Sequence, residues 1–253
     1  MVSLIQAIFL SIVQGICEWF PISSSGHLAI LHNLFGFQDL SFDVFLHFSS
    51  ILAVVILFWK DIVKLLDLRK KENWKYIGLI FIGIIPAGIV GVLFNDLIES
   101  FFSSMIYLGL FFIVSGVLIY STKFAKSKNY KINFFDSLFI GIFQAVAIVP
   151  GISRSGATIS AGLFRGISKE NAVKFSFFMA IPVVLGAALL KLKDLNTSEI
   201  SISLLFVSFI VTFFVSIFSI KLLLRLVKSE KFYLFGVYNF IMGVLVLLFS
   251  IFG

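Results

Sequence analysis

Q-G-I-C-E-W-F-P-I-S-S-S-G-H, residues 14–27, and Q-A-V-A-I-V-P-G-I-S-R-S-G-A, residues 144–157, are two related polar stretches in an otherwise apolar chain. Ordinary residue frequencies would give roughly one match between two such stretches. Without a gap, five positions coincide: Gln14/Gln144, Ile22/Ile152, Ser23/Ser153, Ser25/Ser155 and Gly26/Gly156. The coincidence predicts a duplicated unit whose two polar tips build one site.

The composition predicts whether the chain folds in water or in a membrane. Of the 253 residues, 60% are hydrophobic, 33 are Phe and only 13% are charged, and the mean hydropathy is +1.10. A soluble core of this length cannot bury so much apolar surface. We therefore expect an integral membrane protein.

Apolar runs long enough to cross about 30 Å of hydrocarbon predict six transmembrane helices. These runs are residues 42–59, 76–94, 105–120, 172–190, 202–220 and 232–252. Two further apolar stretches, 2–37 and 134–167, are interrupted by the polar motifs and are not simple spans. Each is expected to form a re-entrant helical hairpin, which enters the membrane and returns to the same side.

Each half of the chain thus has one broken segment followed by three spans. Because three crossings reverse the direction of the chain, the second half must be inverted relative to the first, as in many transporter folds. The fold class predicted is an all-α polytopic membrane protein with an inverted-topology repeat. It forms a single membrane domain over residues 1–253, with repeat one at about 1–125 and repeat two at about 131–253.

The placement of charge supports this topology. Lys and Arg gather in loops 60–75, 121–131 and 221–231, all on one side of the predicted membrane, whereas Asp96 and Glu99 lie in a loop on the other side. The positive-inside rule then places both termini outside. The net charge of +7 is explained by this topology and the anionic inner leaflet, so no nucleic-acid partner is invoked.

The first tip combines a carboxylate with a cluster of hydroxyl groups. Gln14 and Glu18 are four residues apart and therefore share one helix face, just before the break at Pro21. The returning helix opens with three serines, Gly26 and His27. Hydroxyl groups and the free N–H groups of a helix start can bind an anion, and a histidine can exchange a proton near neutral pH.

The second tip supplies the one arginine at either tip, Arg154. A buried arginine requires compensation, which Glu18 and a bound anion can provide, and its planar fork suits phosphate. Asp43 and His47 begin the first full span and either support the site from behind or form a solvated helix end. The candidate phosphate-binding residues are Ser23, Ser25, Gly26, Ser153, Ser155, Gly156 and Thr158.

These motifs resemble those of the bacterial undecaprenyl-diphosphate phosphatases, the bacitracin-resistance membrane phosphatases. The first motif of that family matches Gln14, Glu18, Pro21, Ser23, Ser24, Gly26 and His27, and the second matches residues 150–158. The resemblance extends over length, apolar pattern and Asp43 with His47. Near the last span, Tyr238-Asn239 stands where the family pattern has Tyr-Arg.

The resemblance implies hydrolysis of undecaprenyl diphosphate to the monophosphate and inorganic phosphate, which recycles the cell-wall lipid carrier in the bacterial cytoplasmic membrane. It implies Glu18 as a metal or water-positioning carboxylate, Ser24 and His27 as the catalytic pair and Arg154 as the phosphate clamp. A divalent cation, Mg²⁺ or Ca²⁺, is implied at Glu18 and Gln14, although a neutral amide supplies no charge to it. Which of Ser24 and His27 attacks stays open.

The same residues are compatible with two other classes of protein. A lipid-phosphate transporter or flippase can use the same inverted repeat, because fold does not fix function, and a purely structural membrane subunit needs no site. The expected partners are a polyprenyl diphosphate and membrane lipids, with the active site open to the external face. Whether the chain forms a homodimer is undecided by the sequence.

Overall fold

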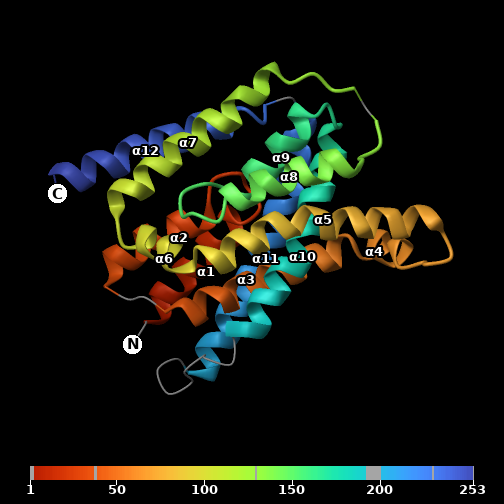
Figure 1. Ribbon diagram of the computed structural model, residues 1–253. Coiled ribbons are helices and arrows are strands. Elements are labelled where there is room, and N and C mark those ends of the chain that lie inside the picture. The colour runs from red at the N-terminus through yellow and green to blue at the C-terminus, as the bar shows by residue number, and fades with distance from the viewer. Residues whose placement is uncertain (1–2, 37–38, 129, 192–200, 230, 253) are drawn as a thin grey trace.

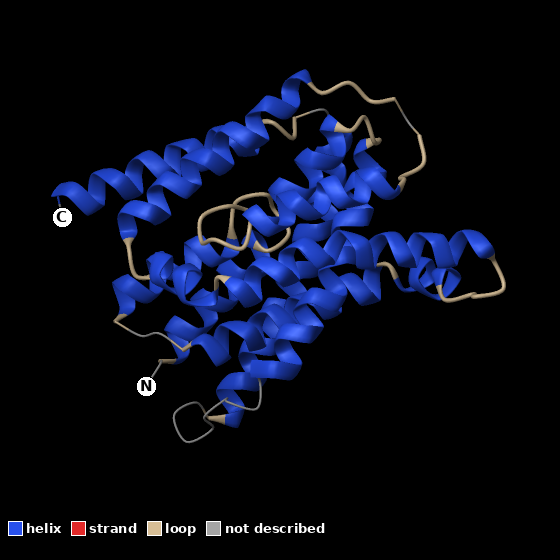
Figure 2. Ribbon diagram, viewed as in Figure 1, coloured by secondary structure: helices blue, strands red, loops and turns tan. Residues whose placement is uncertain are grey.

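The computed structural model describes residues 3–36, 39–128, 130–191, 201–229 and 231–252. Within these ranges the chain forms helices and loops and no strands (Figure 2). In chain order the helices are α1 Leu4–Cys17, α2 Ser24–Phe35, α3 Leu40–Leu57, α4 Trp59–Leu65, α5 Lys71–Leu93, α6 Asn95–Phe102, α7 Met105–Tyr120, the 3₁₀ turn η1 Ser121–Phe124, α8 Phe134–Val146, α9 Arg154–Phe164, α10 Lys169–Lys191, α11 Ile202–Lys228 and α12 Leu234–Phe252.

Both polar stretches interrupt helices, as predicted. The first separates α1 from α2 and the second separates α8 from α9. With 14 and 13 residues, α1 and α8 are apolar but too short to cross a bilayer. The second break turns at Gly151, whose φ of +97° lies where other residues are strained. The first break contains Ser23, whose φ of 66° puts a residue with a side chain in that region.

Five predicted spans are present as single helices. Within the described residues, α5, α7 with η1, α10, α11 and α12 are each long and apolar enough to cross a membrane. The connections after α4 and after η1 lie at the right and top of Figure 1, whereas the α6–α7 connection lies at its left and the start of α1 at its lower left. The basic loops 60–75 and 121–131 therefore belong to the same end of the bundle.

The first predicted span, residues 42–59, differs from the prediction. The chain bends by 76° between α3 and α4, so six spans result only if this bent pair counts as one. The bend follows Phe58, directly before Lys60 and Asp61. Charged side chains at this point cannot continue into hydrocarbon without a large cost, whereas they can lie along its surface.

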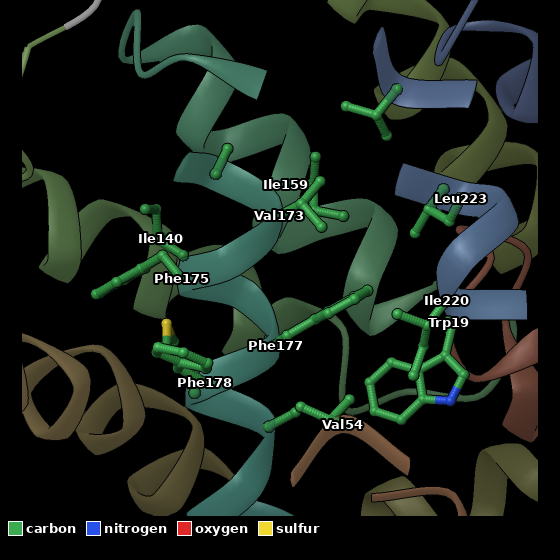
Figure 3. Close-up of a cluster of buried hydrophobic side chains, with 14 of the residues drawn as sticks. Trp19, Val54, Ile140, Ile159, Val173, Phe175, Phe177, Phe178, Ile220 and Leu223 are labelled. Carbon is green, nitrogen blue, oxygen red and sulfur yellow. The ribbon is translucent and has the colours of Figure 1, made fainter. Parts of the chain in front are cut away.

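The largest apolar core lies around α10 and fixes the first break. Trp19, the residue after Glu18, is fully buried, and its ring meets Phe177 of α10 edge to face at 4.9 Å between centroids. Figure 3 shows Trp19 also beside Ile220 of α11. Because Trp19 is anchored against α10 and α11, the neighbouring carboxylate has a fixed position.

The helix pairs are reciprocal between the two halves. The short helix α1 packs along α11, and the short helix α8 packs along α5. At the second of these crossings a Cβ on Gly141 would lie 2.5 Å from the carbonyl oxygen of Gly83, so the two backbones touch. The last helices of the halves, α7 and α12, lie side by side along one edge of the molecule (Figure 1).

The α7–α12 pair depends on glycines at its contact. A Cβ on Gly236 would lie 2.6 Å from the carbonyl oxygen of Gly116, and a Cβ on Gly116 would lie 2.8 Å from that of Gly236. Small residues allow such close approach, and dispersion contacts between backbones then stabilise the pair.

Replacing Gly236 by Ala is expected to destabilise the protein by roughly 1–3 kcal/mol because the new methyl group overpacks this contact. Thermal unfolding of the purified protein in detergent measures the change. Gly88→Ala is the matched control, since no atom lies within 4 Å of its added Cβ. Equal melting temperatures for the two variants would show that the glycine contact contributes nothing.

Candidate active site

The two polar breaks meet in the interior of the molecule (Figure 1). The hydroxyl of Ser155 donates to the carbonyl oxygen of Phe20 at 3.3 Å, which joins the second break to the first. Each returning helix is capped in the same way: Ser23 Oγ accepts from the N–H of Gly26 at 3.2 Å, and Ser153 Oγ accepts from that of Gly156 at 3.0 Å. Two helix N-termini therefore begin beside each other.

Each break is also held by the last helix of the opposite half. The amide of Asn239 on α12 donates to the carbonyl oxygen of Pro21 at 2.7 Å. The hydroxyl of Ser115 on α7 accepts from the N–H of Ser153 at 3.2 Å. These bonds satisfy backbone groups that a broken helix leaves free inside an apolar bundle.

Glu18 is the centre of the site. One of its carboxylate oxygens, Oε1, forms an ion pair with Nη2 of Arg154, which comes from the other motif. The other oxygen, Oε2, accepts a hydrogen bond from Ser24 Oγ at 2.6 Å and lies 2.9 Å from His47 Nδ1. Gln14 Nε2 donates to the same oxygen at 3.1 Å. The carboxylate is therefore buried but fully partnered.

Arg154 retains an unused hydrogen-bond donor. Its Nη1 atom is buried and has no partner, while Nη2 is engaged by Glu18. A buried guanidinium nitrogen without an acceptor is costly. An anionic ligand that supplies this acceptor would be bound with the geometry that guanidinium favours.

A cavity of about 210 Å³ adjoins these side chains. Its polar lining consists of Glu18, Ser23, Ser24, Ser25, His47 and Arg154, and its apolar lining includes Val183 and Val184 of α10. A second cavity of about 1040 Å³ shares Ser25, Val44 and His47 with the first and extends to Asp96 and Glu99 on α6. The polar centre therefore shares a wall with a wider vestibule on the α6 side.

The structure does not bring together all of the predicted site residues. Ser24 contacts Glu18, but His27 turns away: its Nδ1 lies 2.8 Å from the carbonyl oxygen of Ser23 and its Nε2 lies 2.8 Å from the hydroxyl of Tyr238. Among the predicted phosphate-binding residues, Ser23 and Ser25 line the smaller cavity. Buried outside that lining are Gly26, Ser153, Ser155, Gly156 and Thr158.

The two residues expected to support the site have different surroundings. His47 lies directly beside Glu18, within hydrogen-bond distance. Asp43 instead pairs with His32, whose Nε2 lies 2.8 Å from its carboxylate, in the wider vestibule. The i,i+4 spacing placed Asp43 and His47 on one helix face but could not show which of them reaches Glu18.

Three residues near the site had no predicted role: Ser115, Tyr238 and Asn239. Their contacts join segments far apart in the sequence, so local patterns carry no signal for Ser115. The departure at Tyr238-Asn239 was the one available signal, because an amide replaces the arginine of the family pattern. The amide of Asn239 supports the first break, a contact that suits its short side chain.

Replacing Tyr238 by Phe is expected to lower the rate of the phosphate release that the resemblance implies by about tenfold, which corresponds to roughly 1.4 kcal/mol. The hydroxyl of Tyr238 contacts Nε2 of His27 and fixes the ring. The rings of the two residues also stack, with 13° between their planes. A steady-state assay on the purified variant measures the change. Tyr107→Phe, outside both cavities, is the control, and equal rates for the two variants would remove any role for the Tyr238 hydroxyl.

The residues at Glu18 fit a divalent cation only as part of a mixed ligand set. Gln14 Oε1 is buried without a hydrogen-bond partner, so it is an acceptor that lacks a donor or cation. Among the described residues, no group of three or more His, Cys, Asp or Glu could hold a metal ion. A cation here would therefore be held by the Gln14 amide, Glu18, and oxygens from phosphate or water.

Comparison with known proteins agrees with the motifs. The family described as "Bacitracin resistance protein BacA" matches residues 7–245. A protein of Halothermothrix orenii named "Undecaprenyl-diphosphatase" is 38% identical, with 96% of each chain covered. A protein of the same name from Methanococcus vannielii is 41% identical over 96% of this chain and 98% of its own.

A third protein with that name, from Methanosphaera stadtmanae, is 37% identical and covers 99% of both chains. The match with the family thus includes both polar breaks, the helices that hold them and nearly all of the remaining chain. The chain belongs to the bacitracin resistance protein BacA family.

Proposed function

We propose that this protein hydrolyses undecaprenyl diphosphate to undecaprenyl phosphate and inorganic phosphate, and thereby confers bacitracin resistance. The relatives carry the name "Undecaprenyl-diphosphatase". The observation that carries the proposal is the contact of Arg154 with Glu18, which leaves Nη1 of the arginine without an acceptor beside a small polar cavity. A terminal phosphate is an anion of the right chemistry to supply that acceptor.

Ser24 is the better placed of the two candidate nucleophiles. Its hydroxyl lines the cavity and donates to Glu18, whereas both ring nitrogens of His27 lie against other groups. Ser24 Oγ attacks the terminal phosphorus, and its proton passes to Glu18. The bond from that phosphorus to the bridging oxygen breaks, and the lipid monophosphate leaves with the electron pair. Water then attacks the phosphorus of the phosphoserine, the bond to Ser24 Oγ breaks, and inorganic phosphate leaves. Ser24 Oγ takes back the proton from Glu18.

Charge stabilisation comes from both motifs. The Arg154 guanidinium lies where charge develops on the transferred phosphoryl group, and the N-terminus of α2 adds N–H dipoles from the same side as Ser24. A bound Mg²⁺ or Ca²⁺ would supply further positive charge to the phosphate oxygens. Glu18 orients both Arg154 and Ser24, so a single carboxylate aligns the clamp with the nucleophile.

An inverted repeat is part of this proposal. It is supported by the reciprocal pairs α1–α11 and α8–α5, and by the bonds from α12 to the first break and from α7 to the second. We assign two re-entrant hairpins, α1–α2 and α8–α9, and six crossings, one of them the bent α3–α4 pair. The basic loops then face the cytoplasm, and both termini face outward.

External access is supported by the wider cavity. It joins the site at His47 and Ser25 and reaches α6, on the side that carries Asp96 and Glu99 rather than the basic loops. The diphosphate headgroup can enter this vestibule in water while the isoprenoid tail stays in lipid. Neither part of the substrate then has to enter an unfavourable solvent.

Phosphate release from undecaprenyl diphosphate by the purified protein in detergent, with and without Mg²⁺, tests the proposal. Hydrolysis that fails in Ser24→Ala but not in Ser104→Ala, on the α6–α7 connection, supports it. If the protein instead binds the headgroup and moves the lipid across a vesicle membrane without releasing phosphate, it is a lipid-phosphate transporter. The reciprocal helices also suit that class of protein.

A further inference from the structure

Three polar atoms from three side chains form a close triangle at the centre of the site. Glu18 Oε2 lies 2.9 Å from His47 Nδ1 and 3.1 Å from the Gln14 amide nitrogen. The same amide nitrogen lies 2.6 Å from His47 Nδ1. The three side chains come from α1, the first break and α3.

Hydrogen bonds alone satisfy at most two of the three edges of this triangle. With the Gln14 amide turned, a proton on His47 Nδ1 can be shared by two oxygens, but those oxygens then face each other across the 3.1 Å edge. The amide orientation of the structure leaves a different edge unsatisfied. If His47 Nδ1 carries a proton for Glu18, it faces a second N–H donor from Gln14 at 2.6 Å. If Nδ1 carries none, two lone pairs face each other across the 2.9 Å between it and Glu18. In both cases Gln14 Oε1 stays buried without a partner. Buried polar groups in conflict are costly.

We propose that His47 Nδ1, Glu18 Oε2 and the Gln14 amide oxygen bind a divalent cation on one face, with the Gln14 amide turned so that its oxygen points inward. This inference rests on the proposed function for the cation itself, and adds His47 as a third ligand. Neighbouring ligands of an octahedral ion at about 2.1 Å lie about 3 Å apart, close to the three observed edges. The cation accepts all three lone pairs and removes the conflict among these three atoms.

The remaining faces of such a cation suit its place in the cavity. His47 lines both the small cavity and the vestibule, so the open positions face the space assigned to phosphate and water. Arg154 holds the other oxygen of Glu18 and keeps Oε2 turned toward His47. Ser24 uses a second lone pair of Oε2, which a carboxylate oxygen has available.

The donor set determines which ions bind well. Ca²⁺ takes six to eight oxygen ligands and prefers several carboxylates, whereas this site offers one carboxylate oxygen, one amide oxygen and one imidazole nitrogen. Imidazole suits first-row transition ions better than Ca²⁺. We therefore assign a preference for ions such as Zn²⁺ or Fe²⁺ over Ca²⁺, with Mn²⁺ as the paramagnetic probe.

The other two histidines have different partners. His27 contacts the carbonyl oxygen of Ser23 and the hydroxyl of Tyr238, and His32 pairs with Asp43 in the vestibule. The chain contains only these three histidines. A nitrogen signal from a bound paramagnetic ion can therefore be assigned by replacing each histidine in turn.

The test uses Mn²⁺ and the full chain in detergent without substrate. Electron spin echo envelope modulation should detect imidazole nitrogen on Mn²⁺ in the wild type and in His27→Gln and His32→Gln, and lose it in His47→Gln. Titration followed by electron paramagnetic resonance should show Mn²⁺ affinity lowered by at least about tenfold in His47→Gln. In the wild type, Zn²⁺ should displace Mn²⁺ at a concentration at least about tenfold lower than Ca²⁺ requires.

A wild-type spectrum without nitrogen modulation, or a signal that persists in His47→Gln and disappears in His32→Gln, overturns the inference. Phosphate release by the same wild-type preparation is measured in parallel. Release without a His47 signal refutes only the His47 ligand, whereas no release with any ion refutes the proposed function. Matching melting temperatures for the three variants ensure that a lost signal does not report unfolding.

Discussion

Replacing Glu18 by Gln is expected to reduce phosphate release by about 10³-fold or more, which corresponds to roughly 4 kcal/mol of transition-state stabilisation. The substitution keeps the shape of the side chain and removes its charge. Arg154 then loses its ion-pair partner, and Ser24 loses the acceptor of its proton. The measurement is the steady-state rate with saturating undecaprenyl diphosphate, because the loss should fall on kcat.

Glu72→Gln is the matched control for this substitution. Glu72 is an exposed carboxylate that pairs with Lys131 at 3.5 Å, far from either break, and exposed pairs contribute little. Its rate should stay within about twofold of the wild type. A Glu18→Gln protein that folds and retains more than about a tenth of the activity would exclude Glu18 from the mechanism.

Replacing Arg154 by Lys is expected to reduce phosphate release by about 10²–10³-fold although the charge is kept. Lys presents a single ammonium group, so it cannot hold Glu18 with one nitrogen and a phosphate with another. The buried carboxylate keeps a cationic partner, and the protein should therefore fold. The rate and the melting temperature are measured on the same preparation.

Arg165→Lys is the corresponding control, because Arg165 pairs with Asp136 at 2.7 Å at the far end of the same helix, α9. Its activity should remain close to that of the wild type. If Arg154→Lys were equally harmless, the arginine would serve packing and charge balance, as in a structural membrane subunit without a site.

The sequence predicted the site's main contact because the motif is encoded twice. Residues that interrupt apolar helices at equivalent positions must meet other polar groups, since hydrocarbon offers none. The pairing of Arg154 with Glu18 follows from that requirement and is present in the structure. The five unbroken spans were predictable for a similar reason, because length and hydropathy alone determine whether a helix can cross.

Features that depend on direction or on distant contacts were not predictable. Hydropathy does not report the direction of a helix axis. The predicted span 42–59 therefore continued from α3 to Trp59, although the chain bends by 76° there. The orientation of His27 is decided by Tyr238, which lies 211 residues away in sequence. That contact exists because α12 crosses beside the first break. No local pattern encodes such a crossing.

The choice between the histidines shows the same limit. The motif placed His27 three residues after Ser24, but that spacing does not determine whether the ring points toward Ser24 and Glu18 or away from them. The structure instead brings His47 of α3 to Glu18. Its role is a matter of packing between α1 and α3, which the i,i+4 spacing within α3 does not determine.

One residue from each motif, Glu18 from the first and Arg154 from the second, forms a single catalytic unit. A double-mutant cycle on phosphate release, with wild type, Glu18→Gln, Arg154→Lys and the double variant, tests this claim most directly. If the two side chains act as one unit, the double variant should be no slower than the slower single variant, which gives a coupling free energy of at least about 2 kcal/mol. If the losses of transition-state stabilisation in the two single variants add fully in the double variant, the claim is contradicted and the two residues act independently.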